Sequence, residues 1–336
     1  MQSHVPVVSV VIPSYNYGRF VAEAIESVQR QTFSDWECIV VDDGSTDETD
    51  AVVSEIAHLD SRVRLVQQPN RGLSAARNAG IETSSGRFIQ FLDADDRIET
   101  RKLELQVAYL EQHPHVDIIY GNVVYLSDTR GVGMTGSGTE WMHPLHGRGN
   151  AVLLSLVESN ALVVNAALIR SKLADRVGGF NESLPAVEDW DYWLRAAAEG
   201  AWFEFHPLED TAAVVRVHSH SMMTDSVRML SARLAMRQDL AGRVDDALIL
   251  DRNAELAAEE EGTLGIVRIE VGHRSGGIQH LFRAAATSRR KTRKLAWILR
   301  ALLALVLPPR VFSRVARGSF RERLPLLRDR DGHKLK

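Results

Sequence analysis

The chain has 336 residues, of which 45% are hydrophobic and 25% are charged, and its formal net charge at pH 7 is −4. This composition supports one large or two modest folded domains and excludes a disordered, collagen-like or disulfide-stapled protein. The one cysteine, Cys38, lies in an apolar run, so we expect it to be a core residue. We find no secretion signal at the start of the sequence, and together with the cysteine usage this predicts a cytoplasmic location.

The first 130 residues alternate short β-branched runs with apolar residues at helical spacing. We expect strands over 7–12, 38–41, 63–66 and 88–92, and helices over 20–28, 46–59, 73–81 and 100–112. Strand–helix alternation with near-continuous apolar strands predicts an α/β, Rossmann-like fold, in which a mostly parallel sheet has helices on both faces.

The next hundred residues are predicted to complete this domain. The expected elements are strands over 117–125, 162–169 and 214–217, a turn at 178–180 and a helix over 189–199, and the remainder is mostly helical. The glycine-rich stretch 131–149 is expected to be a mobile loop, either a lid over the substrates or a plain connector. Within it, GVGMTG at 131–136 matches the dinucleotide-binding pattern GxGxxG, but no helical pattern follows, so we interpret the match as accidental.

Polar residues follow each of the first four expected strands, at the edge of a parallel sheet where ligands bind. They are Pro13, Tyr15 and Asn16 after the first strand, Asp42 and Asp43 after the second, Gly72 after the third, and Asp93 and Asp95 after the fourth. Carboxylates crowded at neighbouring strand ends are costly unless a cation or hydrogen-bond donors neutralise them. For any single acid, a turn or helix-cap role is the alternative interpretation.

Asp93 and Asp95 are separated by one residue. On an extended segment, both side chains would point to the same side. Two carboxylates suit a hard divalent cation, Mg²⁺ or Mn²⁺, that shares its remaining positions with phosphate oxygens. The sequence therefore predicts a divalent-cation site at this strand end.

Six segments carry a resemblance to a known family. They are VSVVIPSYN (8–16), VVDDGSTD (40–47), ARNAG (76–80), FLDADD (91–96), GGFNE (178–182) and EDWDYWLR (188–195). Over roughly residues 5–220, this text resembles the family 2 glycosyltransferases, which have the GT-A nucleotide-sugar-binding fold. The resemblance implies that the acids hold a nucleoside-diphosphate sugar, and that its sugar is transferred to an acceptor hydroxyl.

The resemblance also assigns roles to the first two strand ends. Pro13 and Tyr15 would line the nucleobase pocket, with Asn16 beside them. Asp42 or Asp43 would accept a hydrogen bond from the base.

The metal and the diphosphate would bind at the other two strand ends. Asp93 and Asp95 fall on the family's DxD motif, in which the first acid faces the ribose or the metal and the second binds the metal. Gly72 and Arg77 would lie against the nucleotide, although Arg77 could equally be a structural counter-ion for the acids. His218 follows the last expected strand, where a family histidine can approach the metal or the diphosphate; a solvated loop histidine is the alternative.

Glu188 and Asp189 match an acidic pair in which the family's aspartate is the general base. An acceptor hydroxyl is a poor nucleophile near neutral pH and needs a positioned proton acceptor. We expect both acids at the start of a helix, where the helix dipole would keep Asp189 ionised. The alternatives are that both are simple capping acids, or that Asp191 is the base.

The implied reaction is a single displacement at the anomeric carbon, which inverts its configuration. The QxxRW motif and the flanking membrane-spanning segments of processive polysaccharide synthases are not found, so we favour a non-processive enzyme that extends a glycan or a lipid-linked glycan. The alternative from another functional class is a catalytically inactive nucleotide-sugar-binding scaffold. Nucleic acid is not an expected partner, because the basic part of the chain has few aromatic residues for stacking on bases.

The net charge conceals a basic tail. Residues 283–336 contain 16 lysines and arginines against three acidic residues, a balance of +13, so the rest of the chain carries −17. Within the tail, RRKTRK (289–294) precedes an apolar run over 295–307, which is shorter than the roughly 20 residues that a membrane span needs. Cationic flanks suggest instead a helix lying on an anionic membrane, and thus an enzyme peripheral on its cytoplasmic face. The alternative is a helix packed against the acidic body.

These patterns predict three regions. A GT-A catalytic domain would cover 1–222, a helical region 223–282, and the basic amphipathic tail 283–336.

Overall fold

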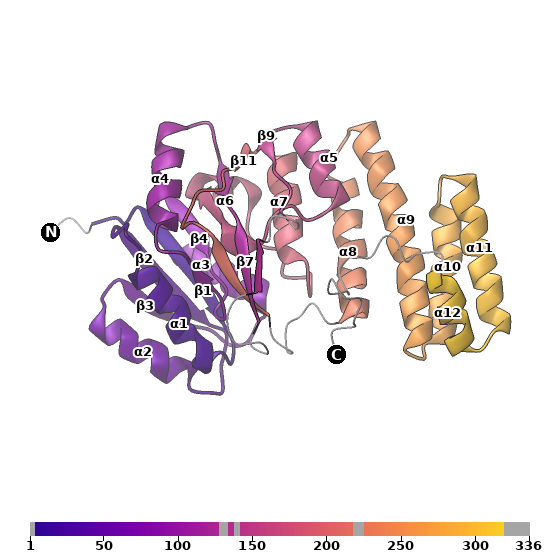
Figure 1. Ribbon diagram of the computed structural model, residues 1–336, viewed down its shortest axis with the longest axis horizontal. Helices are drawn as coiled ribbons and strands as arrows, with labels where there is room; N and C mark the ends of the chain where they lie inside the picture. The colour runs from indigo at the N-terminus through magenta and orange to yellow at the C-terminus, as the bar shows by residue number, and fades with distance from the viewer. Residues whose placement is uncertain (1–3, 128–133, 138–141, 218–224, 319–336) are drawn as a thin grey trace. The chain divides into compact units, whose positions relative to one another are not determined.

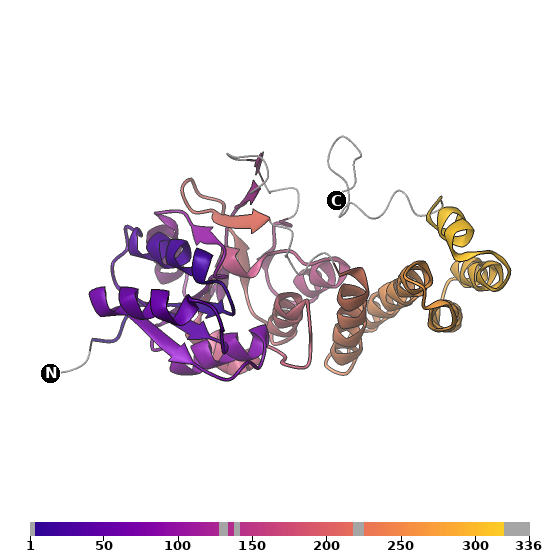
Figure 2. The same ribbon diagram turned by 90° about the horizontal axis from the view of Figure 1, so that it is seen from below.

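The structure is a computed structural model that describes residues 4–127, 134–137, 142–217 and 225–318 (Figures 1 and 2). The chain forms two compact units. The first comprises residues 1–224 with 242–249, and the second comprises 225–241 with 250–336. Each unit has a hydrophobic core of its own.

The first unit is built on an eight-stranded sheet with the order β3-β2-β1-β4-β10-β6-β11-β9. Its strands are β1 (Val8–Ser14), β2 (Trp36–Asp42), β3 (Val63–Gln67), β4 (Phe88–Phe91), β6 (Ile118–Tyr120), β9 (His146–Gly147), β10 (Ala167–Arg170) and β11 (Phe203–Phe205). The first four strands along the chain are parallel, whereas β10 runs antiparallel between β4 and β6, and β9 runs antiparallel to β11. The expected mostly parallel sheet is therefore confirmed.

A smaller four-stranded sheet has the order β5-β12-β7-β8. Its strands are β5 (Arg97–Ile98), β7 (Val123–Ser127), β8 (Met134–Ser137) and β12 (Ala213–Val217). Because β12 pairs antiparallel with β5, residues far apart in the sequence meet directly after the fourth strand of the large sheet.

Helices cover both faces of the large sheet (Figure 1). They are α1 (Gly18–Gln29), α2 (Thr49–Leu59), α3 (Leu73–Thr83), α4 (Lys102–Gln112), α5 (Asn150–Glu158), α6 (Ser171–Val177) and α7 (Glu188–Ala198). Apolar residues of α1, α2 and α4 form one core with alternate residues of β1. On the opposite face, Ala76 of α3 packs on Ile39 and Val41. Tyr192 of α7 contacts Phe91, which lies in the same row across the sheet as Ile39, so α7 shares the α3 face.

A glycine sets how closely α3 approaches the sheet. A Cβ atom at Gly80 would lie 2.2 Å from the side chain of Val11, so any larger residue would push α3 away from β1. Arg77 lies one turn earlier on the same face of the helix. Gly80 therefore helps to fix the depth at which Arg77 enters the protein.

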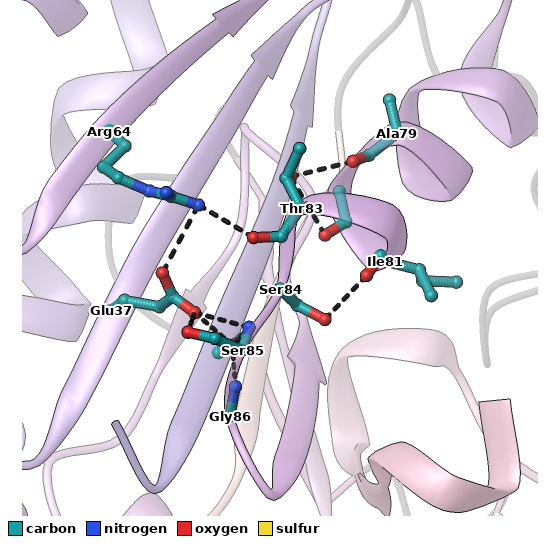
Figure 3. A network of polar contacts seen from close by, with 10 residues as sticks. Glu37, Arg64, Ala79, Ile81, Thr83, Ser84, Ser85 and Gly86 are labelled. Atoms are coloured by element: carbon teal, nitrogen blue, oxygen red, sulfur yellow. Dashed lines mark hydrogen bonds and ion pairs between the residues drawn. The ribbon is translucent and has the colours of Figure 1, made fainter. Parts of the chain in front are cut away.

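A polar network ties α3 to the amino ends of the strands (Figure 3). Glu37 accepts hydrogen bonds from the hydroxyl of Ser9, at 2.7 Å, and from both the backbone N–H and the hydroxyl of Ser85, at 2.8 and 2.7 Å. Arg64 lies 3.4 Å from Glu37 and donates to the carbonyl of Thr83 at 2.9 Å. These contacts anchor the end of α3 at the edge of the sheet opposite to the polar strand ends.

The second unit consists of helices. They are α8 (Ser226–Ala241), the larger part of α9 (Ala247–Glu270), α10 (Arg274–Thr287), α11 (Lys291–Val306) and α12 (Pro309–Gly318). Arg237 is buried and paired with Glu260 at 2.7 Å, and Trp297 is buried in the core between the last helices. The predicted helical C-terminal region is confirmed. Among the residues that the structure describes, no helix is long and apolar enough to cross a membrane.

Several expectations differ from the structure. The expected strand over 162–169 begins instead with a 3₁₀ turn (Val164–Ala166), and only β10 is extended. The stretch 131–149 contains β8 and β9 rather than only a loop, and its residues 131–133 and 138–141 lie outside the described residues. The short strands β5 and β11 were not predicted, because two or three residues are too few to show a period. The expected boundary at 282/283 runs through the middle of α10.

Candidate active site

The predicted site residues gather at the carboxyl edge of the large sheet. Asp42 ends β2, and Asp93 follows β4 by two residues. Asn165 reaches the same edge, because β10 is antiparallel and starts there. The structure therefore brings together residues from the first half of the chain with residues after 160.

The segment from Asp93 to Asp96 is a turn rather than the extended segment that we expected. The backbone N–H of Asp96 donates to the carbonyl of Asp93 at 3.0 Å, which closes the turn. Asn165 clamps it: its Oδ1 accepts from the N–H of Asp93 at 2.9 Å, and its amide donates to Asp96 Oδ2 at 2.5 Å. Asp93 and Asp95 therefore do not lie on an extended segment as we expected, although both remain partly exposed at the site.

Asp96 is the buried member of this turn, at 4% exposure. Burial, and then the charges of Asp93 and Asp95, raise its pKa well above the usual range, although hydrogen bonds from Arg216 and Asn165 oppose the shift. Tyr17 lies in the same field, because burial and then the three aspartates raise the pKa of its hydroxyl to about 12. The turn is thus a concentrated negative site.

Arg77 joins this turn to α7. Its guanidinium is buried and donates to Asp93 Oδ1 at 2.7 Å and to Glu188 Oε1 at 2.6 Å. Burial alone would lower the pKa of Arg77, but the charges of Asp93 and Glu188 raise it overall. The guanidinium also lies over the ring of Phe180, 5.2 Å from its centre. Of the two roles left open by the sequence, this geometry is that of a counter-ion that braces the acids.

Asp189 is the second residue of α7, which begins directly after a strained residue. Val187 has φ of 57°, a left-handed conformation that is unusual for a β-branched residue and turns the chain into the helix. Asp189 Oδ1 accepts from the backbone N–H of Trp190 at 2.7 Å, and Oδ2 accepts from the amide of Asn160 at 3.1 Å. Two donors therefore orient the carboxylate.

The expectation that the helix dipole keeps Asp189 ionised was wrong. Burial, followed by the charge of Glu188, raises its pKa to about 7. The charge of Arg77 and the hydrogen bonds from Trp190 and Asn160 oppose this shift without cancelling it. A carboxyl group with this pKa can exchange a proton near neutral pH.

The second strand end carries two aspartates with different contacts. Asp43 accepts from the side chain of Gln68 at 2.7 Å and from the backbone N–H groups of Arg71 and Gly72 at 2.8 and 2.7 Å. It therefore holds the loop that starts α3, in which Gly72 has φ of 92°. Asp42 accepts from the N–H of Ser45 through Oδ1.

The first strand end is more open. Pro13 is buried within β1, whereas Tyr15 is 45% exposed and Asn16 is exposed. Asn16 has φ of 57°, and its side-chain oxygen accepts from the N–H of Thr46 at 2.8 Å, so it links the first two strand ends. His218 lies outside the described residues.

Four residues of this site were not predicted to be part of it: Tyr17, Asn160, Asn165 and Arg216. Arg216 of β12 donates from its backbone N–H to Asp96 at 2.7 Å and from Nε to the carbonyl of Asp95 at 3.1 Å, and its Nη2 pairs with Glu23 at 2.7 Å. For Asn165 the sequence held a signal, a single amide within an apolar run. The other three had none, because their contacts depend on folding.

The arrangement combines three elements of chemistry. Asp93 and Asp95 offer two carboxylates to a hard cation, although within the described part of the chain no group of three or more His, Cys, Asp or Glu side chains is placed to hold a metal ion. Asp189 offers a proton acceptor. Arg77 holds the two acidic elements together.

Comparisons with known proteins identify relatives of the chain. The family model described as "Glycosyl transferase family 2" matches residues 9–175. An uncharacterized glycosyltransferase of Haemophilus influenzae is 30% identical over 229 residues, which are 66% of this chain and 68% of the relative. The UDP-Glc:alpha-D-GlcNAc-diphosphoundecaprenol beta-1,3-glucosyltransferase WfgD of Escherichia coli is 38% identical over 127 residues, which are 38% of this chain and 49% of that protein.

A solved structure shares the fold. TarS 1–349 of S. aureus, solved in complex with UDP-GlcNAc, superimposes with a TM-score of 0.64 at 19% identity, covering 94% of this chain and 92% of that chain. At this identity the likeness is one of fold.

Proposed function

Because the chain belongs to glycosyl transferase family 2, has the GT-A fold and is an enzyme that acts on nucleotide sugars, we propose a specific reaction for it. The enzyme transfers one sugar to a hydroxyl group of a glycan or a lipid-linked glycan, depends on a divalent cation, and inverts the anomeric configuration. It is non-processive.

The observation that carries this proposal is the bridge made by Arg77. Its guanidinium binds both Asp93, after β4, and Glu188, at the start of α7. Asp189 is the next residue along α7, so a proton acceptor lies at the same edge of the sheet as the DxD acids. A direct displacement needs these two parts at one site: a group that binds the donor diphosphate and a base that faces the acceptor.

Asp189 is proposed as the general base. Its pKa of about 7 leaves it ionised in part at neutral pH and gives it more proton affinity than an ordinary carboxylate. The amide of Asn160 and the N–H of Trp190 hold it in one orientation. Glu188 acts through Arg77 and through its charge, which helps to keep the pKa of Asp189 high.

Asp93 and Asp95 are proposed to hold the divalent cation, Mn²⁺ or Mg²⁺. Their donor set fits a hard cation, since it consists of carboxylate oxygens, and one oxygen of Asp93 is already neutralised by Arg77. When bound, such a cation stabilises the negative charge of the departing nucleoside diphosphate. His218, a further candidate ligand, is left as a hypothesis.

The donor nucleotide is proposed to bind over the first two strand ends. Asp42 is the better candidate for a hydrogen bond to the base, because the carboxylate of Asp43 already accepts three hydrogen bonds from the Gly72 loop. Tyr15 follows the neighbouring strand β1, is exposed, and could stack on the base. Asn16 accepts a hydrogen bond from the N–H of Thr46 and so holds the loop after β1 against the loop after β2.

A lipid-linked acceptor is supported by one relative. WfgD acts, by its name, on a diphosphoundecaprenol substrate, and this chain spans about half of its length. An acceptor of that kind stays in a membrane, so we propose that the enzyme works at the cytoplasmic face of a membrane, with residues 283–336 as the peripheral contact.

A donor screen tests the proposed reaction. Release of UDP, dTDP or GDP from nucleotide sugars is measured with and without Mn²⁺ or Mg²⁺, first with water and then with lipid-linked glycans as acceptors. We expect one nucleotide sugar to be consumed only with a cation, and Asp95→Ala to abolish this consumption. Glu55→Gln, an exposed residue of α2, serves as the control and should keep full activity. Full turnover by the Asp95 variant would contradict the metal assignment.

A further inference from the structure

The helix α11 has two apolar faces. Trp297, Ala301 and Ala304 are at most 2% exposed and belong to the core of the second unit. On the other side, Leu295, Leu299, Leu302 and Val306 are exposed by 66, 58, 49 and 80%. They recur at helical spacing, i, i+4, i+7 and i+11, and so form one stripe along the helix, which we call the leucine face.

A stripe of this kind is unusual on a folded protein. Large exposed apolar side chains normally occur singly, and a continuous row of them marks a surface that contacts a partner. The next helix repeats the pattern on a smaller scale, since α12 exposes Val311 and Val315 by 47 and 50%. The two helices are adjacent in the fold (Figures 1 and 2).

Part of the positive charge of this region is already paired. Arg290 binds Glu255 at 2.6 Å, Arg293 binds Glu255 and Glu259, and Arg289 binds Asp251. These pairs attach the start of α11 to acidic residues of α9. Such contacts are expected if the basic helix packs against the rest of the protein, which was the alternative to membrane binding.

A second set of cations is not used in this way. Lys291, Lys294, Arg310 and Arg314 are exposed and have no ion pair within the part of the chain that the structure describes. Lys291 lies one turn before Leu295, in line with the leucine face, and Lys294 flanks it. An apolar stripe beside free positive charge complements a surface that is apolar inside and anionic outside.

We propose that the leucine face of α11 docks on a membrane of anionic phospholipids, with its leucines among the acyl chains and Lys291 and Lys294 at the headgroups. This inference rests on the proposed membrane location and identifies the surface that makes the contact. Interfacial helices bind in this way, through buried apolar area together with attraction to anionic lipids.

Vesicle flotation of the full chain tests the proposal. The protein should float with vesicles that contain phosphatidylglycerol and stay behind with pure phosphatidylcholine, and added salt should weaken binding. Leu299→Glu with Leu302→Glu should weaken the binding at least tenfold. Leu59→Glu, which changes a single exposed leucine of α2, should not change it. Reversal of Lys291 and Lys294 to glutamate should also weaken binding, and more so at low salt.

Three results would overturn the proposal. The first is that the unaltered full chain fails to float with anionic vesicles at low salt, even if a chain without residues 319–336 does float. The second is that the double leucine variant binds as well as the unaltered protein. The third is that this variant loses a dimer, measured by light scattering, while it still binds vesicles, because a second copy would then cover the face. Nucleotide release with water as acceptor should be unchanged in every variant, so a failure of docking is distinguishable from a failure of the proposed reaction.

Discussion

The raised pKa of Asp189 makes a prediction in which activity and stability change in opposite directions. In the folded protein the carboxyl group holds its proton up to pH of about 7, whereas an exposed aspartate releases it near 3.8. Between these values, the unfolded chain loses a proton that the folded protein retains, so stability falls as the pH rises and then levels off above about 7. Ionisation of Asp189 therefore lowers the free energy of unfolding.

The substitution Asp189→Asn removes this cost with little change of shape. The new amide oxygen can still accept from Trp190 N–H. The amide of Asn160 can reverse, because its Oδ1 is buried without a hydrogen-bond partner among the described residues, and it can then accept from the new amide. A shift from 3.8 to about 7 corresponds to about 4 kcal/mol at most. Since water reaches part of the half-buried group, we expect about 2 kcal/mol, or a rise in Tm of about 5 °C.

Thermal unfolding at pH 8 and pH 4.5, together with a transfer assay, checks this prediction. Asp189→Asn should melt higher than the unaltered protein at pH 8, should lose most of this advantage at pH 4.5, and should transfer sugar at least a thousandfold more slowly. In the unaltered enzyme, kcat/KM should rise with pH through about 7. Asp191→Asn is the matched comparison on the same helix: it removes the partner of the buried Arg195, 2.8 Å away, and should lower the Tm at pH 8. Equal melting temperatures at both pH values would refute the raised pKa, and rapid transfer would refute the base.

Three further changes test the rest of the site and the fold. Arg77→Met leaves Asp93 and Glu188 without their buried counter-ion, so we expect a loss of about 3 kcal/mol in the free energy of unfolding; a loss below about 1 kcal/mol, measured by urea denaturation, would contradict the bracing role. Asn165→Ala removes the two hydrogen bonds that hold the aspartate turn, so the Mn²⁺ concentration that gives half-maximal activity should rise roughly tenfold. An unchanged concentration would show that the shape of this turn does not determine cation binding. Glu37→Ala opens the network at the amino ends of the strands and should cost about 2 kcal/mol without slowing transfer per folded molecule; slower transfer would show that this edge is coupled to the site.

The sequence predicted the sheet well because its central strands β1, β2 and β4 are buried at every position. Their sequences are mostly apolar as a result, and that pattern is visible without any tertiary information. Acids that follow such strands meet at one edge for topological reasons, so Asp42 and Asp93 could be expected near each other. The antiparallel course of β10 could not, because strand direction depends on connections that leave no local pattern.

The contacts within the site were less predictable. Arg77 and Glu188 are 111 residues apart, and only packing decides that an arginine of α3 reaches α7. The turn at Asp93 is stabilised by Asn165, which accepts a hydrogen bond from the N–H of Asp93 and donates one to Asp96. This tertiary contact favours a turn over the extended conformation that the local spacing predicts. The proton affinity of Asp189 depends on how much water reaches it, which a position at a helix start does not reveal.

The division of the chain into units has a consequence for how the enzyme can be made and cut. Residues 242–249 belong to the first unit, where Asp246 accepts a hydrogen bond from Asn150 at 2.7 Å, yet they follow α8 of the second unit. During synthesis, the first unit therefore cannot be completed by residues 242–249 until α8 of the second unit has also emerged from the ribosome. A truncation after 224 would deprive it of that segment, and one after 249 would leave α8 without its partner helices. No single cut therefore yields two intact domains, so an expression vector for either unit has to carry segments of both.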